Sequence, residues 1–187
     1  MKWLKYIIWI SFILLYKPVF AQTENQFQGI TFYLVRHAEK DTGNNPALKP
    51  AGYARAGDLY RALKDTRIDR IYVSQYRRTE LTADSLRIYK KIGLVHYNAG
   101  DNADDLFRQI TVQAVKQDTV LIIGHSNTIP GIIRRLGVKN FNLVEIPDNE
   151  YDNLYVVTVE KNKASLKIIK YGKVSPPAEK AAMKALQ

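Results

Sequence analysis

The sequence predicts an α/β fold, a three-layer α/β/α sandwich with a mainly parallel central sheet. Short apolar runs typical of strands alternate along the chain with longer segments in which apolar residues recur at helical spacing, an order typical of strands joined by crossover helices. Some runs, such as residues 120–123, are apolar without alternation, as expected for strands covered on both faces. The length of 187 residues suits one domain with a single core.

The first half of the domain reads as strand, loop, helix and strand. Residues 30–35 are β-branched, aromatic or aliphatic and predict a strand, whereas residues 41–50, with Gly, Asn and two prolines, predict a loop. Residues 51–64 predict an amphipathic helix, and residues 68–73 a second strand. The residues that this helix is expected to bury are Tyr53, Ala56, Tyr60 and Leu63.

The middle of the chain continues the alternation. Residues 78–90 predict a helix, 94–97 a short strand, 103–114 a further helix and 120–123 a fully apolar strand. We expect the first of these helices to bury Leu81, Ser85 and Ile88 or Tyr89, and the second to bury Ala103, Phe107, Ile110 and Ala114.

The last part of the domain predicts a short helix and a hairpin. Residues 128–136 form the helix, with Pro130 in the first turn, where backbone donors need no partner within the helix. Residues 154–160 and 164–170 predict a terminal β-hairpin. Residues 173–187, a Pro pair followed by an Ala/Lys-rich stretch, predict a peripheral tail.

The N-terminus predicts export. Lys2 and Lys5 precede an apolar run, which Lys17 ends, and small residues allow cleavage after Ala21. We therefore expect residues 1–21 to be a signal peptide and the protein to reach the periplasm or the extracellular space. The alternative is a retained anchor, although the run is short of the about 20 apolar residues that span a bilayer.

The remaining chain divides into a linker, a domain and the tail. The linker is residues 22–29 and the folded domain residues 30–172. After cleavage of the signal peptide we expect no stable membrane span.

The amino-acid composition excludes some kinds of site and limits the classes of partner. The sequence has no Cys, which excludes disulfides, thiol nucleophiles and Cys-based metal sites. The net charge of +10 fits anionic substrates, lipid headgroups or nucleic acid, or simply a surface charged for solubility. No nucleic-acid-binding motif is present, so we expect no nucleic-acid partner.

Polar residues gather where the predicted strands end. Arg36 and His37 follow the first strand, residues 74–78 the second, Asp101 the third, and residues 124–126, Gly-His-Ser, the fourth. The carboxyl ends of parallel strands meet at one edge, where α/β proteins bind ligands. Two histidines and two or three arginines there predict an anion site for a phosphoryl group, with sulfate or a carboxylate as alternatives.

These residues resemble the motifs of a known family. Residues 34–39, Leu-Val-Arg-His-Ala-Glu, resemble the Arg-His-Gly/Ala-Glu signature of the histidine phosphatase superfamily, which also contains the phosphoglycerate mutases. Residues 74–83 resemble its second motif, in which Ser74 is followed four residues later by Arg78 and then by a Thr-Ala pair, and residues 124–126 resemble its third. The chain is thus similar to a small exported member of branch 1, and residues 30–172 would be its histidine phosphatase domain.

The resemblance implies a phosphoglycerate mutase-like fold and a covalent mechanism. His37, neutral and held in one tautomer by an acceptor at Nδ1, would attack phosphorus through Nε2 and form a phosphohistidine. Arg36, Arg78 and His125, the last protonated beside the anion, would stabilise the transferring group. The cationic side chains would fill the role that Mg²⁺ has in kinases, so neither a metal nor another cofactor is expected.

The proton donor for the leaving group is predicted less directly. Asp101, near the third strand, is the candidate that the resemblance implies, followed by Asp104, Asp105 and Glu39. Asp101 also suits an N-cap. Some members of the family have no separate acid, which suits good leaving groups such as those of phosphoramidates.

Other residues are expected at the margin of the pocket. Ser126 and Asn127 would add donors to the substrate or cap the following helix, and Glu39 would orient Arg36 or the loop. Glu145 and Asp148 could reach the pocket mouth. The remaining expectations are that residues 41–50 and 138–153 rim the pocket, that Tyr151 and Tyr155 line it or belong to the core, and that His96 is structural or at the surface.

The function predicted from these motifs is a metal-independent phosphatase that hydrolyses a phosphomonoester or a phosphoramidate. Its partner would be a small phosphorylated substrate or a phosphate group on a surface. One alternative is phosphoglycerate mutase-type transfer at the same phosphohistidine, which export and the short chain disfavour. The other is a phosphate-binding protein without turnover.

Overall fold

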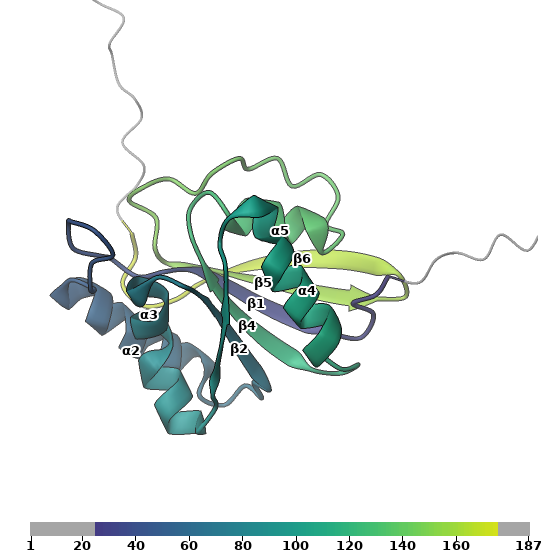
Figure 1. The fold of residues 1–187 in the computed structure, drawn as a ribbon, viewed down its shortest axis with the longest axis horizontal. Coiled ribbons are helices and arrows are strands. Elements are labelled where there is room, and N and C mark those ends of the chain that lie inside the picture. Colours follow the sequence, from purple (N-terminus) through teal and green to yellow (C-terminus); the bar gives the residue numbers. More distant parts are fainter. Residues whose placement is uncertain (1–24, 176–187) are drawn as a thin grey trace, which may run out of the picture.

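The structure is a computed structural model that describes residues 25–175 (Figure 1). The predicted signal peptide and most of the predicted tail lie outside these residues. Within residues 25–175, no helix combines the length and the apolar content that crossing a bilayer requires. The strands are β1 (Thr31–Arg36), β2 (Arg70–Ser74), β3 (Leu94–Tyr97), β4 (Thr119–Gly124), β5 (Asn153–Glu160) and β6 (Lys163–Lys170). The helices are α2 (Pro50–Leu63), α3 (Arg77–Lys90), the 3-10 helix η1 (Asp101–Ala103), α4 (Asp104–Gln113) and α5 (Ile129–Arg135).

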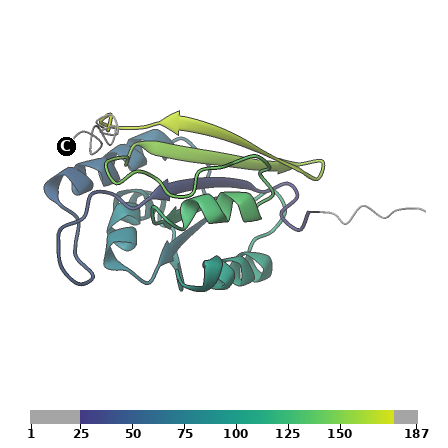
Figure 2. The ribbon, with the colours of Figure 1, turned by 90° about the horizontal axis from the view of Figure 1, so that it is seen from above.

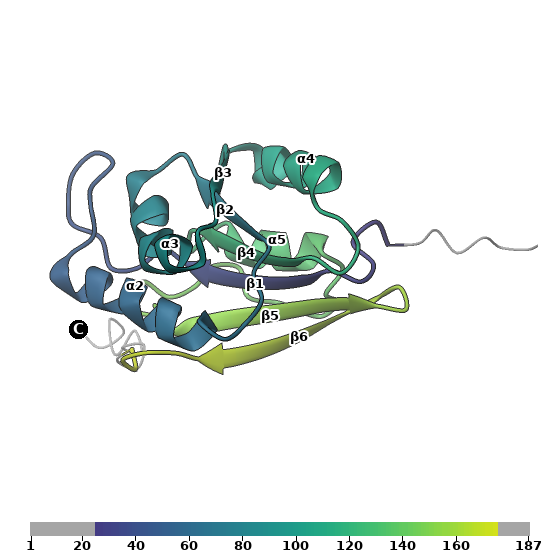
Figure 3. The same cartoon turned by 90° about the horizontal axis from the view of Figure 1, so that it is seen from below.

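The six strands form one sheet in the order β3-β2-β4-β1-β5-β6, which can be followed across Figure 3. The first four in this order pair in parallel, whereas β5 joins β1 antiparallel and β6 joins β5 antiparallel. Figure 2 shows this hairpin, in yellow-green, at the opposite margin of the molecule from α4. The predicted mainly parallel sheet and terminal hairpin are both confirmed.

Helices cover both faces of the sheet, as predicted. Alternate residues of each central strand point to opposite sides, so Leu34 and Ile122 belong to one core and Val35 and Ile123 to the other. The first core contains residues from α4 and α5, and the second contains residues from α2 and α3 (Figures 1 and 3). Burial on both faces explains why β1 and β4 are almost wholly apolar.

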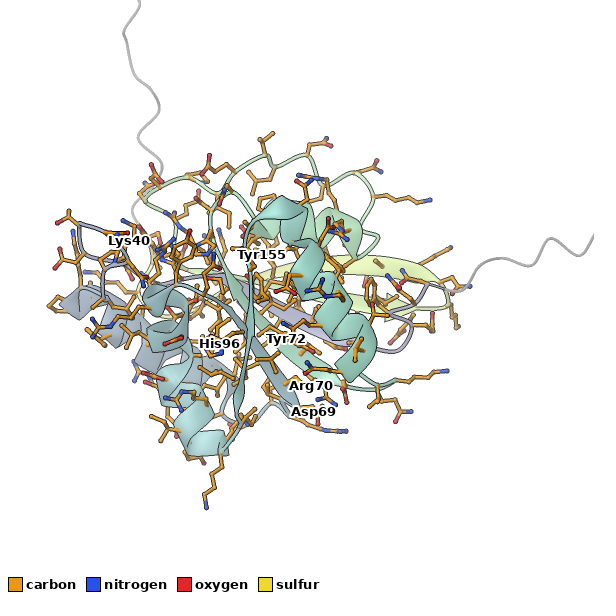
Figure 4. All side chains as sticks on the ribbon, in the orientation of Figure 1. Lys40, Asp69, Arg70, Tyr72, His96 and Tyr155 are labelled. Atoms are coloured by element: carbon orange, nitrogen blue, oxygen red, sulfur yellow. The ribbon has the colours of Figure 1, made fainter. Side chains whose placement is uncertain are left out.

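The register of the central strands brings their carboxyl ends to one level. Arg36 is paired with Gly124, and Val73 with Ile123, so Ser74 ends β2 at the same height. Figure 4 shows Lys40 at this end of the sheet, and Asp69 and Arg70, where β2 begins, at the other. The motif residues therefore emerge together.

The predicted buried face of α3 is wrong. Ile88 and Tyr89 are 63% and 60% exposed, and the helix instead buries Thr79, Thr82, Ala83 and Leu86. These residues recur at steps of three and four, so the helical period was right but its phase was not. Buried threonines are tolerated because each hydroxyl donates to a backbone carbonyl of its own turn, Tyr76 O for one and Arg78 O for the other.

The burial expected of α2 holds in part. Ala56 and Leu63 are buried as predicted, but Tyr53 is 48% exposed, and Leu59 and Arg55 are buried instead. The Arg55 guanidinium can be buried because it pairs with a carboxylate, as described below.

Gly52 lets the backbone after His37 lie directly against α2. A Cβ at this position would collide with the main-chain carbonyl of Glu39 and press on Leu48. We expect Gly52→Ala to destabilise the protein by about 1–3 kcal/mol, because backbone has to move to make room. The unfolding free energy from urea titration measures this.

Gly57→Ala is the matched control in the same helix. Its Cβ would meet only the flexible end of Arg61, and replacing an interior helical glycine stabilises by about 0.5–1 kcal/mol. Equal losses in the two variants would contradict the proposed contact at Gly52.

Candidate active site

His37 is fixed by its own backbone and that of the next residue. Its main-chain N donates to Gly124 O at 2.9 Å, which extends the β1–β4 pairing by one residue. The N of Ala38 donates to Thr82 Oγ1 at 2.9 Å, and that hydroxyl donates to Arg78 O at 2.7 Å. The turn after β1 is therefore held between β4 and α3.

The side chain of His37 is held in one tautomer, with the acceptor at Nδ1 that the mechanism requires. Nδ1 lies 2.8 Å from Ala38 O, and since a carbonyl can only accept, Nδ1 carries the proton and Nε2 keeps its lone pair. Burial lowers the pKa of His37 to about 3, and the charges of His125, Arg78 and Arg36 lower it further against the effect of the Ala38 bond. The imidazole is neutral at pH 7, and the lone pair on its Nε2 is chemically able to act as a nucleophile.

His125 faces the same pocket, with its ring centroid 5.3 Å from that of His37. Arg78 Nη2 lies 3.2 Å from Nδ1, which must accept because a guanidinium only donates, and Nε2 then donates to Ser74 Oγ at 2.9 Å. Burial, together with the positive charges of Arg78 and Arg36, lowers the pKa of His125 to about 4.

Without an anion in the pocket His125 is therefore neutral at pH 7, and its expected protonation beside a bound anion stays a prediction. Its Nδ1 already accepts from a guanidinium, so a proton there would oppose a fixed positive charge. A bound dianion would raise the pKa of this histidine by attraction of opposite charges.

Arg36 is positioned by the segment before β5. Its Nη1 donates to Pro147 O at 2.8 Å, its Nη2 lies 3.4 Å from Asp148 Oδ1, and its guanidinium carbon lies 4.3 Å from the ring centroid of Tyr151. This segment belongs to residues 138–153, which were predicted to rim the pocket.

Arg78 has a similar aromatic support. Its guanidinium carbon lies 4.2 Å from the ring centroid of Tyr76, which also packs edge-on against His125 at 5.3 Å. The Nε donors of both Arg36 and Arg78 are buried and have no acceptor among the described residues. Both guanidinium groups line one pocket, and two guanidinium groups there favour an anionic ligand, which can accept charge-assisted hydrogen bonds from them.

The pocket between these residues has a volume of about 460 Å³, which is within the range of small-molecule sites. Its described lining includes the cations Arg36, Lys40 and Arg78 against the single carboxylate of Asp148. With both histidines neutral, this excess of positive charge suits a dianion. The other lining residues are His37, Gln75, Tyr76, Asn98, Ala99, Gly100, His125, Ser126, Asn127 and Thr128.

Of the three residues expected at the margin of the pocket to bind the substrate or to orient its other residues, Ser126 and Asn127 line the pocket and Glu39 does not. The Ser126 hydroxyl donates to Glu145 Oε1 at 2.8 Å. Glu39 pairs with Arg55 at 2.8 Å, and Arg55 also donates to Lys173 O at 3.0 Å. Of the two roles predicted for Glu39, orienting the loop fits this ion pair and orienting Arg36 does not.

The carboxylates predicted as proton donors differ in their hydrogen-bond and ion-pair partners. Asp101 begins η1, but its side chain lies outside what the structure describes, so its role stays a prediction. Asp104 pairs with Arg135 at 2.6 Å. Asp105 accepts from the Asn98 N–H at 2.7 Å, and this bond lowers the pKa of its carboxyl, which makes it a poor proton donor at neutral pH.

Several lining residues were not predicted. Lys40 directly follows the first motif, and Gln75 and Tyr76 lie inside the second motif. Their positions next to the predicted motif residues are the signal that could have identified them. Asn98 follows β3, and its Oδ1 accepts from Gln75 Nε2 at 3.3 Å.

The structure distinguishes the alternatives predicted for the two tyrosines and for the third histidine. Tyr151 supports Arg36, with its ring centroid 6.5 Å from that of His37. Tyr155 is buried in the core, and His96 lies at the surface with Nε2 2.7 Å from Glu80 Oε1 (Figure 4). Among residues 25–175 no three His, Asp or Glu side chains come together in a way that could hold a metal ion.

Residues 32–98 match the histidine phosphatase superfamily, branch 1. The predicted family is confirmed over this segment, which includes His37 and Arg78, while His125 follows it. The match supports the predicted enzyme class, a phosphatase. A search of curated proteins gave no significant match.

Solved structures of low sequence identity share the fold. The mycobacterial glucosyl-3-phosphoglycerate phosphatase has 14% identity over 75% of this chain and 98% of its own, with a TM-score of 0.58. The alpha-ribazole phosphatase of Shigella flexneri has 13% identity over 75% of this chain and 96% of its own, with a TM-score of 0.56. A phosphoserine phosphatase mutant of Entamoeba histolytica has 16% identity over 74% of this chain and 95% of its own, with a TM-score of 0.55. These similarities confirm the predicted phosphoglycerate mutase-like fold.

The two neutral histidines make stability depend on pH. Their folded-state pKa values, about 3 for His37 and about 4 for His125, lie below the about 6.5 of an unfolded chain. As pH falls below 6.5 the unfolded chain therefore binds protons that the folded chain does not, and stability is lost. We expect the drop in unfolding free energy from pH 7 to pH 5 to shrink by about 1–2 kcal/mol in His37→Gln or His125→Gln.

Urea titrations at the two pH values measure that drop for each variant. The comparison uses differences within one variant, so a change of stability at pH 7 does not affect it. A double variant should show the smallest drop, and identical drops in all four proteins would contradict the neutral states.

Proposed function

We propose that the protein is a phosphatase that hydrolyses a small phosphomonoester or phosphoramidate through a covalent phosphohistidine on His37. The observation that carries the proposal is the bond from His37 Nδ1 to Ala38 O, at 2.8 Å, which leaves Nε2 unprotonated in a pocket shared with Arg36, Arg78 and His125. The similar structures are named as phosphatases, two of them for glucosyl-3-phosphoglycerate and phosphoserine, and this supports a small phosphorylated substrate.

In the first step the Nε2 lone pair attacks phosphorus. The bond from phosphorus to the leaving oxygen or nitrogen breaks, and the leaving atom takes up a proton. The imidazole becomes positively charged, and Ala38 O stabilises it by accepting from Nδ1–H. Arg36 and Arg78 balance the charge on the phosphoryl oxygens.

In the second step water attacks the phosphohistidine. The phosphorus–Nε2 bond breaks, its electron pair returns to the ring, and the released proton passes to solvent while phosphate departs. His37 is then neutral again. The pKa of about 3 favours this return, because the neutral ring is the stable form at pH 7.

His37→Ala tests the covalent step. We expect turnover of p-nitrophenyl phosphate to fall by at least about 1,000-fold, because the variant has no nucleophile. The wild-type protein, quenched in alkali during turnover of a ³²P-labelled ester, should retain label that acid releases, as a phosphoramidate does. The matched control is His96→Gln, at the surface histidine beside Glu80, which should keep wild-type activity.

The outcomes separate the alternatives. Phosphate release identifies a hydrolase, whereas movement of the phosphoryl group within a phosphoglycerate would identify a mutase. Tight phosphate binding with neither turnover nor trapped label would identify a binding protein and overturn the proposal.

Mutation can distinguish a carboxylate that donates the proton from one that only orients Arg36. Asp101 is the predicted donor, and Asp148 is the carboxylate in the described lining. A donor matters most for poor leaving groups. We expect Asp101→Asn to lower kcat for alkyl phosphates by about 100-fold while changing that for p-nitrophenyl phosphate much less.

Asp148→Asn should affect both substrates alike, because Asp148 contacts Arg36 at 3.4 Å. If Asp148→Asn shows the selective loss instead, Asp148 is the donor. Equal losses for both substrates in both variants would mean that no carboxylate of this pair donates the proton.

We also propose export, on the basis of Lys2, Lys5 and the apolar run that follows them. The mass of the protein isolated from its native cells tests this. Loss of residues 1–21 supports cleavage, and the full-length mass supports the retained anchor.

A further inference from the structure

A second cavity, of about 740 Å³, lies beside the catalytic pocket. Four residues line both: Ala99 and Gly100 after β3, and Asn127 and Thr128 before α5. Two of the four have side chains no larger than a methyl group. A substrate held by its phosphoryl group at His37 can therefore extend across this shared rim.

One wall of the second cavity is a face of α5. Thr128, Gly131 and Arg135 recur at steps of three and four and lie on one side of the helix, with Arg134 next to them. No heavy atom lies within 4 Å of the position that a Cβ on Gly131 would take. The missing side chain of this helical glycine thus leaves room that belongs to the cavity.

The opposite wall comes from η1 and the start of α4, through Asn102, Ala103 and Asp104. Asp104 pairs with Arg135 at 2.6 Å, and Arg135 also donates to Asn102 O at 2.7 Å. This pair joins the two walls, and the charge of Arg135 is already balanced.

Arg134 differs from Arg135 in this respect. Its Nη1 donates to Leu143 O at 2.7 Å and to Phe141 O at 3.4 Å, which fixes the guanidinium without neutralising it. Among the described residues no carboxylate pairs with Arg134. Within the described residues the cavity therefore has a held guanidinium without a carboxylate partner, on a lining that mixes polar side chains with Ala and Gly.

We propose that the second cavity binds the leaving group of the substrate and selects one that carries a second anionic group, a carboxylate or a phosphate, which pairs with Arg134. The proposal rests on the proposed phosphatase function and names its substrate class: an extended phosphomonoester with an anion at each end. A planar guanidinium held by backbone carbonyls is suited to such a group, because its remaining donors can form paired hydrogen bonds with it.

A series of synthetic esters tests the charge selection. Alkyl phosphates of three to eight carbons are compared with phosphates of the same length that end in a carboxylate. We expect the wild-type protein to prefer the carboxylate at one length by about tenfold in kcat/KM. In Arg134→Ala this ratio should fall to about one, mainly through KM.

Arg67→Ala is the matched control for surface charge. Arg67 is a mostly exposed arginine that pairs with Asp69, and Figure 4 shows Asp69 at the far end of the sheet from Lys40, which lines the catalytic pocket. It should keep the wild-type ratio. If it loses the ratio to the same extent as Arg134→Ala, general attraction to a basic surface explains the preference and the proposal fails.

Gly131→Leu tests the space. It should lower the ratio of kcat/KM for hexyl phosphate to that for methyl phosphate by about tenfold, because the side chain enters the cavity. Gly131→Ala adds only a methyl group in open space and a better helix former, so it should change this ratio much less. Melting temperatures show whether each variant folds, and Arg134→Ala decides the question if Gly131→Leu does not.

The experiments distinguish failure of the proposed phosphatase function from failure of the proposed leaving-group cavity. If neither p-nitrophenyl phosphate, a phosphoramidate nor any of these esters is hydrolysed, the proposed function fails; if one of the first two is hydrolysed and none of the alkyl esters is, only the leaving-group cavity is overturned. If all are hydrolysed with no preference for the carboxylate and no effect of Gly131→Leu on the length ratio, the phosphatase stands and the leaving-group cavity is overturned.

Discussion

Arg36 and Gly124 are register partners at the ends of β1 and β4, and the main-chain N of His37 continues this pairing by donating to Gly124 O at 2.9 Å. Because the strands are parallel, the residues that follow them leave the sheet side by side. His37 and His125 therefore come to face each other at a centroid distance of 5.3 Å. A shift of one residue in this register would send one of the two imidazoles to the other face of the sheet, and the pocket would be lost.

The electrostatics of the pocket follow from the same crowding. Two imidazoles and two guanidinium groups share a small, largely buried volume, and arginine does not give up its proton. Burial is the main cause of the low pKa values of the histidines, about 3 for His37 and about 4 for His125, and the nearby arginine charges lower them further. For His37 the result is an Nε2 lone pair that is available at neutral pH, as the proposed nucleophilic role requires. For His125 it is a hydrogen-bonding link between Ser74 and Arg78.

The catalytic pocket also depends on segments that are remote in sequence. Residues 147–151 place Arg36 through Pro147 O and the ring of Tyr151, while Gln75 donates to Asn98 and so braces the loop that separates the two cavities. Under the proposed function the loops would determine specificity and the residues at the strand ends would perform the chemistry, which is the usual division in α/β proteins.

The sequence by itself determined the order of strands and helices, the edge at which polar residues gather, and the motif residues His37, Arg78 and His125. These features are local, because periodicity and strand ends can be read within a few residues. Only the tertiary structure decided the phase of α3, the pairing of Glu39 with Arg55, the neutral state of His125 and the open space at Gly131. Each of these depends on what a second, distant segment places beside the residue, and no local pattern contains that information.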